Sequence, residues 1–155
     1  MINVIEKTSS IGRPASLRRR FAALVYELLL LAAVWFIAAF VFIAFARNPP
    51  HGALRAVFQL YLWLVTAAYF AWFWSHGGQT LAMKTWRIRL VRRSGEAVSL
   101  ARAFARYGLA TLGYGLAGLT LFWAIFDKDR QFLHDRLAGT RLIDARADSD
   151  ALDAP

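Results

Sequence analysis

Three long apolar stretches dominate the pattern of hydrophobic and polar positions along the chain. Residues 21–46 contain a single charged residue, Glu27, whereas residues 56–75 and 107–126 contain none. A helix needs about 20 apolar residues to cross the roughly 30 Å hydrocarbon core of a bilayer. All three stretches reach that length, so we predict three hydrophobic helical segments embedded in a membrane.

The composition favours a membrane protein over a soluble one. Of the 155 residues, 58% are hydrophobic and six are Trp, and a soluble protein of this length would have too few polar helices to cover three apolar ones. A cleaved signal peptide is the alternative for the first stretch, but its apolar run is about twice as long as a normal signal core. We therefore predict an all-α integral membrane protein. The chain has no cysteine, which excludes disulfide and thiolate chemistry.

Basic residues flank the apolar stretches unevenly. Residues 1–20 contain five Lys and Arg against one acid, and residues 77–106 contain seven against one. Because basic residues favour the cytoplasmic side, we predict a multi-pass membrane protein with a cytoplasmic N-terminus. The net charge of +9 would suggest nucleic acid as the partner of a soluble protein. Here we expect contact with the lipid bilayer and its anionic head groups, and no nucleic acid.

Two conflicting features leave the path of the third stretch open. Residues 127–155 carry five basic residues, which favours a cytoplasmic C-terminus, whereas three full crossings would place that end outside. A re-entrant segment that breaks at its glycines would resolve the conflict. The length of 107–126 favours instead a plain crossing with close helix packing through Gly113 and Ala117.

A short region of β structure is predicted between the second and third stretches. Trp86, Ile88 and Leu90 alternate with arginines or valine, which is the period of a strand. We expect a small cytoplasmic β-hairpin near residues 84–100, with a turn at residues 93–96.

Residues 139–144 are a second strand candidate. If both pieces lie on the cytoplasmic side of the membrane, they can pair into a small sheet under the bilayer. Ser99 is a suitable N-cap for the helix that follows the hairpin.

Glu27 is the main candidate for chemistry, because an ionised carboxylate is costly in a hydrocarbon environment. Arg20 lies seven residues before it, so the two side chains share one helix face within about 20°, roughly 10 Å apart along the axis. Such a group usually faces the interior of a helix bundle, as part of an ion path, a solute path or an oligomer contact. The alternative is that Glu27 simply reaches toward the interface. Tyr26 is a candidate hydrogen-bond donor to it.

His134 and Asp135 form the second candidate. The surrounding segment lacks the glycine and glutamate of a calcium loop, and the chain has no nucleophile motif, phosphate loop or paired-histidine metal motif. We therefore expect neither an enzyme nor a bound metal or cofactor. For Asp135 we expect a structural role, either pairing with a cytoplasmic arginine or capping a helix, and a ligand role is the alternative.

Three motifs resemble the RDD family of bacterial membrane proteins. The first is "RFAALVYE", from Arg20 to Glu27, and the second is the segment that begins "GQTLAMK". The third is "FDKDRQFLHDRLAGT", which contains His134 and Asp135, the latter matching the second family aspartate. The positions that match in the second motif are Gly78, Gln79, Thr80 and Lys84. The resemblance implies a domain over residues 14–143, with flexible tails at 1–13 and 144–155.

Two positions depart from the family pattern. Glu27 stands where the family has aspartate, which places the carboxylate one methylene farther out, and Ala82 stands where a glycine is usual. The resemblance implies a protein of the bacterial plasma (inner) membrane whose molecular function is unassigned, with transport of unidentified ligands as the role suggested for the family. We expect either an oligomeric path for an ion or small solute, with Glu27 as its titratable group, or a non-catalytic membrane anchor. In the second case Arg20, Glu27 and Asp135 hold the helices together, and the protein binds a partner protein, a second copy or anionic lipid.

Overall fold

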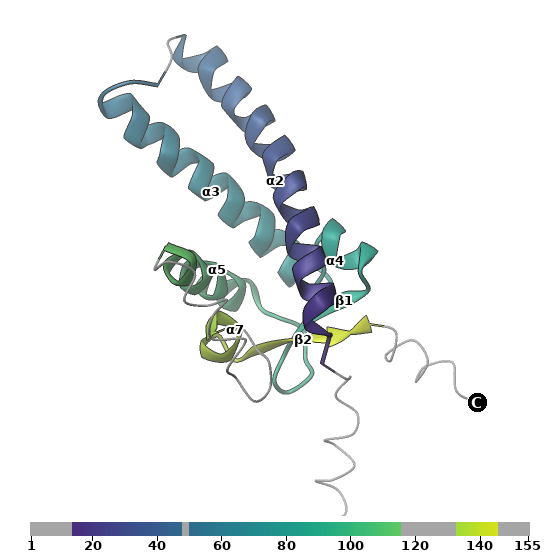
Figure 1. Ribbon diagram of the computed structural model, residues 1–155. Coiled ribbons are helices and arrows are strands. Elements are labelled where there is room, and N and C mark those ends of the chain that lie inside the picture. Colours follow the sequence, from purple (N-terminus) through teal and green to yellow (C-terminus); the bar gives the residue numbers. More distant parts are fainter. Residues whose placement is uncertain (1–13, 48–49, 116–132, 146–155) are drawn as a thin grey trace, which may run out of the picture.

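Two long helices extend from a small group of shorter helices and strands. We call this group the foot. The computed structural model describes residues 14–47, 50–115 and 133–145 (Figure 1). The helices α2 (Leu17–Ala46) and α3 (Ala53–Ser75) form an antiparallel hairpin. Five shorter elements gather at its foot: α4 (Leu81–Thr85), β1 (Ile88–Arg92), α5 (Leu100–Gly115), α7 (Leu133–Leu137) and β2 (Thr140–Asp144).

The two long helices confirm the predicted segments 21–46 and 56–75. Within the described residues, α2 and α3 are the helices long and apolar enough to cross a membrane. Only 6% of the most apolar window of α2 and 17% of that of α3 are buried, whereas the core helix of a soluble protein would be mostly buried. Large apolar side chains such as Phe36 and Phe45 are 76% and 86% exposed. Such surfaces suit a lipid environment, so α2 and α3 are candidate membrane-spanning helices.

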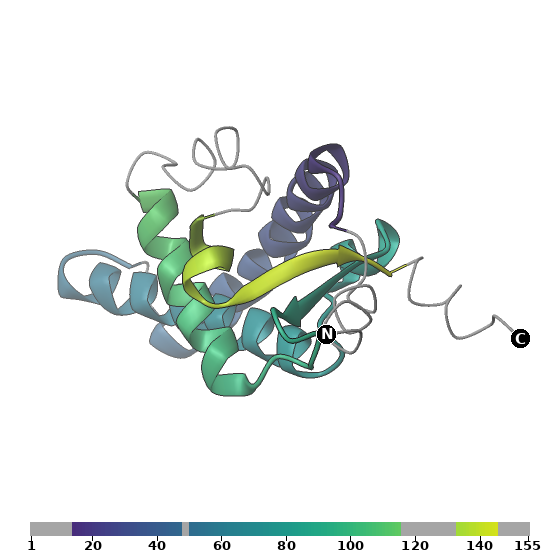
Figure 2. The same cartoon turned by 90° about the horizontal axis from the view of Figure 1, so that it is seen from below.

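The helix at the start of the third predicted segment, 107–126, begins seven residues earlier than predicted. Helix α5 begins at Leu100, directly after Ser99, and therefore includes Arg102 and Arg106. In both views α5 lies across the foot of the α2–α3 hairpin rather than alongside it (Figures 1 and 2). Residues 116–126 lie outside the described part of the chain, so a third crossing and a re-entrant path both stay predictions.

The strands pair differently from the predicted hairpin. Strand β1 is antiparallel to β2, with Leu90 opposite Leu142, so the predicted pairing of these two pieces is confirmed. The return strand of the hairpin is wrong: residues 97–99 are not a strand, and residues 84–85 belong to α4.

The hairpin fails because both edges of β1 are already occupied. One edge pairs with β2. On the other edge the Leu90 amide donates to the Gly78 carbonyl at 2.8 Å, and the Gln79 side chain donates to the Ile88 carbonyl at 2.8 Å. A turn does follow β1 as predicted, but the chain then places Val98 in the core, where it is 2% exposed.

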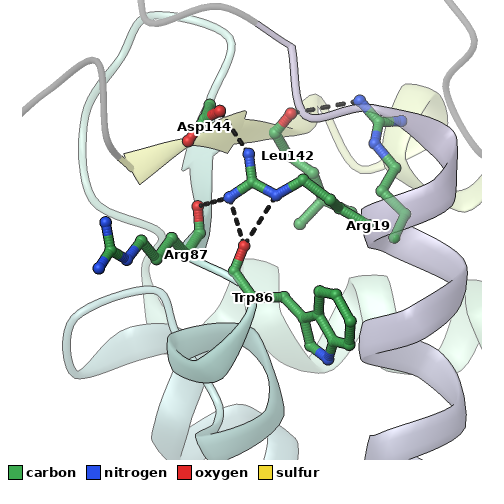
Figure 3. A network of polar contacts seen from close by, with 6 residues as sticks. Arg19, Trp86, Arg87, Leu142 and Asp144 are labelled. Atoms are coloured by element: carbon green, nitrogen blue, oxygen red, sulfur yellow. Dashed lines mark hydrogen bonds and ion pairs between the residues drawn. The ribbon is translucent and has the colours of Figure 1, made fainter.

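The N-terminal end of α2 is joined to the sheet through Arg19 (Figure 3). Its guanidinium donates to the Trp86 carbonyl, to the Arg87 carbonyl at 2.9 Å, and to the carboxylate of Asp144. Asp144 was expected in a flexible tail, but it is the last residue of β2. The other predicted tail residues lie largely outside the described part of the chain.

The core lies between the sheet and the lower ends of the helices. Ile88, Leu90 and Leu142 of the sheet pack with Trp74 of α3 and Met83 of α4. This packing places α4 against the lower half of α2, where Arg20 and Glu27 lie, and α5 against α3.

Among the described glycines of the foot, Gly78 is the one at which an added side chain would clash most severely. Its φ is +71°, and a Cβ there would lie 2.3 Å from the Leu90 carbonyl oxygen. We expect Gly78→Ala to lower the free energy of unfolding by about 3 kcal/mol, since a left-handed backbone and a steric overlap both add cost. Unfolding in detergent micelles, followed by Trp fluorescence, measures the loss.

The matched control is Gly77→Ala. Gly77 also has a positive φ, +104°, but a Cβ there would meet nothing within 4 Å. We expect Gly77→Ala to lower the free energy of unfolding by about 1–2 kcal/mol, because only the left-handed backbone adds cost there. Equal losses in the two variants would contradict the proposed overlap with β1.

Candidate functional site

A cavity of about 240 Å³ lies where α2, α3 and α5 meet the sheet. Its walls are mostly apolar side chains, including Leu24, Leu28, Phe70 and Ala110. Its polar lining consists mainly of Arg20, Glu27, Arg106, Thr111 and His134. The structure therefore brings three of the predicted site residues, Arg20, Glu27 and His134, to one cavity.

Glu27 is bound by two hydroxyl groups. Its side chain is buried, at 6% exposure. The Tyr69 hydroxyl donates to Oε1 at 2.7 Å, and the Thr80 hydroxyl donates to Oε2. These bonds join α2 to α3 and to the start of α4. The prediction that Tyr26 donates to Glu27 is wrong. Tyr26 is 42% exposed, and the tyrosine that donates is Tyr69.

The second family motif explains how Thr80 reaches Glu27. Thr80 is the N-cap of α4, where its hydroxyl oxygen accepts from the Met83 amide at 3.2 Å while its proton goes to Glu27. Gly78 and Gln79 bond to β1 and fix the chain just before the cap. Lys84 is exposed in the last turn of α4. The motif is thus a support for the carboxylate, with Lys84 outside that support.

Asp135 is bound by Arg106, which sequence analysis did not identify. The Arg106 Nη2–Asp135 Oδ1 distance is 2.6 Å, and Nε donates to the same oxygen at 2.8 Å. Asp135 is fully buried at 0% exposure and Arg106 is 5% exposed. The guanidinium also lies 4.1 Å from the ring centroid of Trp74, a distance that suits a cation–π contact. Asp135 therefore pairs with an arginine, which is one of the roles expected for it, and the cytoplasmic side of the pair stays a prediction.

His134 lies beside this ion pair and is neutral. Its side chain is 3% exposed, and its Nε2 lies 3.3 Å from Arg106 Nη2. Because a guanidinium can only donate, Nε2 accepts and the ring proton is on Nδ1. Burial lowers the pKa of His134 to about 4, although the charge of Asp135 opposes the change.

Arg20 connects the two halves of the site. It is 3% exposed, and its Nη2 donates to the Leu142 carbonyl at 3.3 Å. It also interacts electrostatically with Asp135 and Arg106. Arg20 and Glu27 thus share a helix face, as their spacing predicts, but the hydrogen bonds of Glu27 go to hydroxyls.

Two contributors, Tyr69 and Arg106, were missed because their partners are distant in sequence. Arg106 did carry a signal: it lies three residues after Ala103 and four before Ala110, on the buried face of α5. A cation on an apolar helix face needs a partner. Tyr69 carried no comparable signal, because it lies in an aromatic run typical of a membrane interface. Within the described ranges, no three His, Asp or Glu residues gather as a metal site would require.

Comparison with known proteins places these residues in a family. The sequence model of the RDD family matches residues 14–139, most of the chain. The chain is also 35% identical over 81 residues to the uncharacterized protein RP437 of Rickettsia prowazekii (strain Madrid E). That alignment covers 52% of this chain and 44% of the relative, so the chain spans less than half of the relative's length. No solved structure matches the chain.

The buried ion pair leads to a stability prediction. Asp135→Asn leaves the buried Arg106 without its counter-charge, and we expect the free energy of unfolding to fall by about 3–5 kcal/mol. The control is Glu96→Gln, which removes the partner of Arg92 from an ion pair whose carboxylate is 63% exposed. We expect that change to cost under about 1 kcal/mol. Similar losses in both would contradict a special role for the buried pair.

The neutral His134 leads to a pH prediction. Its folded-state pKa of about 4 lies below the ordinary value of 6.5, so the unfolded chain binds the proton more tightly. Stability is therefore complete above pH 6.5 and falls as the pH drops toward 4, by about 3 kcal/mol in all. Thermal unfolding in detergent between these pH values measures the loss. His134→Gln should remove most of this pH dependence, and an unchanged profile in that variant would contradict the assignment.

Proposed function

Because the chain belongs to the RDD family, we propose that it is a multi-pass protein of the bacterial plasma membrane that binds an ion or small solute beside Glu27. In this proposal the protein transports that ligand as an oligomer. The observation that carries the proposal is the carboxylate of Glu27, which is 6% exposed and lines a cavity of about 240 Å³ within a membrane helix.

The coordination of Glu27 leaves room for a ligand. An ionised carboxylate has about four lone-pair sites, and the hydroxyls of Tyr69 and Thr80 use two of them. The remaining sites suit a cation or the protonated amine of a small solute. Ionisable groups within membrane helices commonly mark such pathways.

The orientation follows from the distribution of charge. Arg18, Arg19 and Arg20 lie at the end of α2 that meets the basic sheet. Basic residues favour the cytoplasmic side, so we place the foot and the N-terminus in the cytoplasm, with the turn between α2 and α3 outside. Glu27 then lies about 10 Å farther into the membrane than Arg20.

Transport requires more than the described helices of one copy. Two spanning helices do not enclose a path, and the cavity lies at the lower ends of α2 and α3. The proposal therefore includes a second copy or a partner membrane protein that packs on the exposed apolar surfaces of α2 and α3.

A second candidate function is a non-catalytic membrane anchor that binds a partner protein or anionic lipid. It is favoured by the contacts that join the foot to α2 without any ligand, namely Arg19 with Asp144 and Thr80 with Glu27. In both proposals the chain is not an enzyme and uses no cofactor.

Flux in liposomes tests transport. Wild-type protein should exchange external sodium or potassium for internal protons at the Glu27 carboxylate, so that the internal pH, read by a trapped dye, rises when the salt is added outside. We expect Glu27→Gln to slow this flux by about tenfold or more, because it removes a charge-assisted contact to the ligand. Glu27→Asp, which restores the carboxylate of the family pattern, should retain part of the flux.

The control is Glu96→Gln, which removes the same charge from an exposed position. Its flux should match wild type. Absence of flux in the wild type, or equal flux in wild type and Glu27→Gln, would contradict transport through this site and favour the anchor.

A further inference from the structure

A group of arginines lies on the face of the sheet that points away from the membrane helices. Ile88, Leu90 and Leu142 occupy the inner face, in the core. Because side chains alternate along a strand, Arg141 and the residue that follows β1, Arg93, belong to the outer face. Figure 2 views the molecule from this side, with β2 in front of the helices.

Register brings Arg93 and Arg141 together. Val91 pairs with Arg141, and the Arg93 amide donates to the Gly139 carbonyl at 3.0 Å, which continues the ladder by two positions. Arg93 and Arg141 are therefore diagonal neighbours, about 7–8 Å apart at their backbones and within reach of long side chains.

Arg102 of α5 completes the group. Its Nη1 lies 3.2 Å from the position that a Cβ of Gly139 would take, so its guanidinium lies against the same turn. Gly139 has a φ of +64° and no side chain to separate the guanidinium from the backbone. Three cations from β2, α5 and the turn after β1 thus gather around one glycine.

These cations are not neutralised within the described residues. None of the three forms an ion pair there, whereas Arg19, Arg92 and Arg106 each do. Nε and Nη2 of Arg141 are buried without a hydrogen-bond partner. Burial, and then the nearby charge of Arg93, lowers the pKa of the Arg141 guanidinium. An anion placed here would relieve the repulsion and satisfy both orphaned donors.

We propose that Arg93, Arg102 and Arg141 form a binding site for a phosphate group. Guanidinium groups match the tetrahedral oxygens of phosphate with paired hydrogen bonds, which a lysine cluster would not do as well. The phosphate comes either from a soluble phosphorylated molecule or from a lipid head group. The site is separate from the Glu27 cavity, so it stands whether or not Glu27 takes part in transport.

The full chain in nanodiscs of phosphatidylcholine, titrated with pyrophosphate in a calorimeter, tests the proposal. We expect saturable binding, weakened about tenfold or more by Arg93→Gln or Arg141→Gln, since each removes charged hydrogen bonds. The matched control is Arg92→Gln at the end of β1, next to Arg93, because the Arg92 guanidinium already pairs with Glu96. It should change affinity by less than about twofold, within the range of long-range charge effects.

A second arm identifies the source of the phosphate. If nanodiscs with phosphatidylglycerol abolish pyrophosphate binding by the wild type, the site takes lipid head groups; if binding persists, it takes a soluble phosphate. Arg93 is exposed, so its variant keeps the proposal testable should Arg141→Gln not fold. No saturable binding, an equal loss in Arg92→Gln, or equally tight binding of an acidic peptide without phosphate would overturn the proposal.

Discussion

The buried carboxylate of Glu27 needs hydrogen-bond donors, and the arrangement of the foot follows from how they are supplied. Once the helices have packed, this carboxylate is shielded from water, and both of its hydrogen-bond donors come from the chain itself. Tyr69 comes from the facing helix, which sets how α2 and α3 lie against one another. Thr80 comes from the cap of α4, whose position depends on the bond between Gly78 and β1. The carboxylate thus fixes the membrane hairpin and the sheet relative to each other.

The buried charge of Arg106, at the other side of the cavity, is likewise compensated by groups of the chain itself. Arg106 carries Asp135 on one side and the ring of Trp74 on the other, so its charge is compensated although it is almost fully enclosed. A pair of this kind contributes little net stability, but it disfavours alternative packings in which either charge would be left alone. The paired, enclosed arginines near the helices differ from the repelling arginines of the outer sheet face. The paired arginines favour this packing of the fold, whereas the arginines of the outer sheet face are the proposed binding site for an anion.

Sequence patterns predicted the local elements and few of their partners. Hydropathy found α2 and α3, alternation found β1, and the spacing of Arg20 and Glu27 placed both on one face that lines the cavity. The pairing of β1 with β2 was anticipated, but its other edge was assigned to a hairpin and is in fact held by Gly78 and Gln79. Periodicity shows which face of an element is buried and does not show what covers it. Tyr69 and Arg106 were not predicted for this reason. Tyr69 lies 42 residues from its partner Glu27 in the sequence, and Arg106 lies 29 residues from Asp135.

The contacts of Arg19 and Arg20 have a consequence for biosynthesis. Their partners Asp144 and Leu142 lie 125 and 122 residues later in the chain. A ribosome adds about 5–20 residues per second, so α2 exists for several seconds before those partners emerge. During that interval Arg20 and Glu27 must be accommodated by water, head groups or the insertion machinery. Helix α2 therefore reaches its final packing only after β2 has been synthesised.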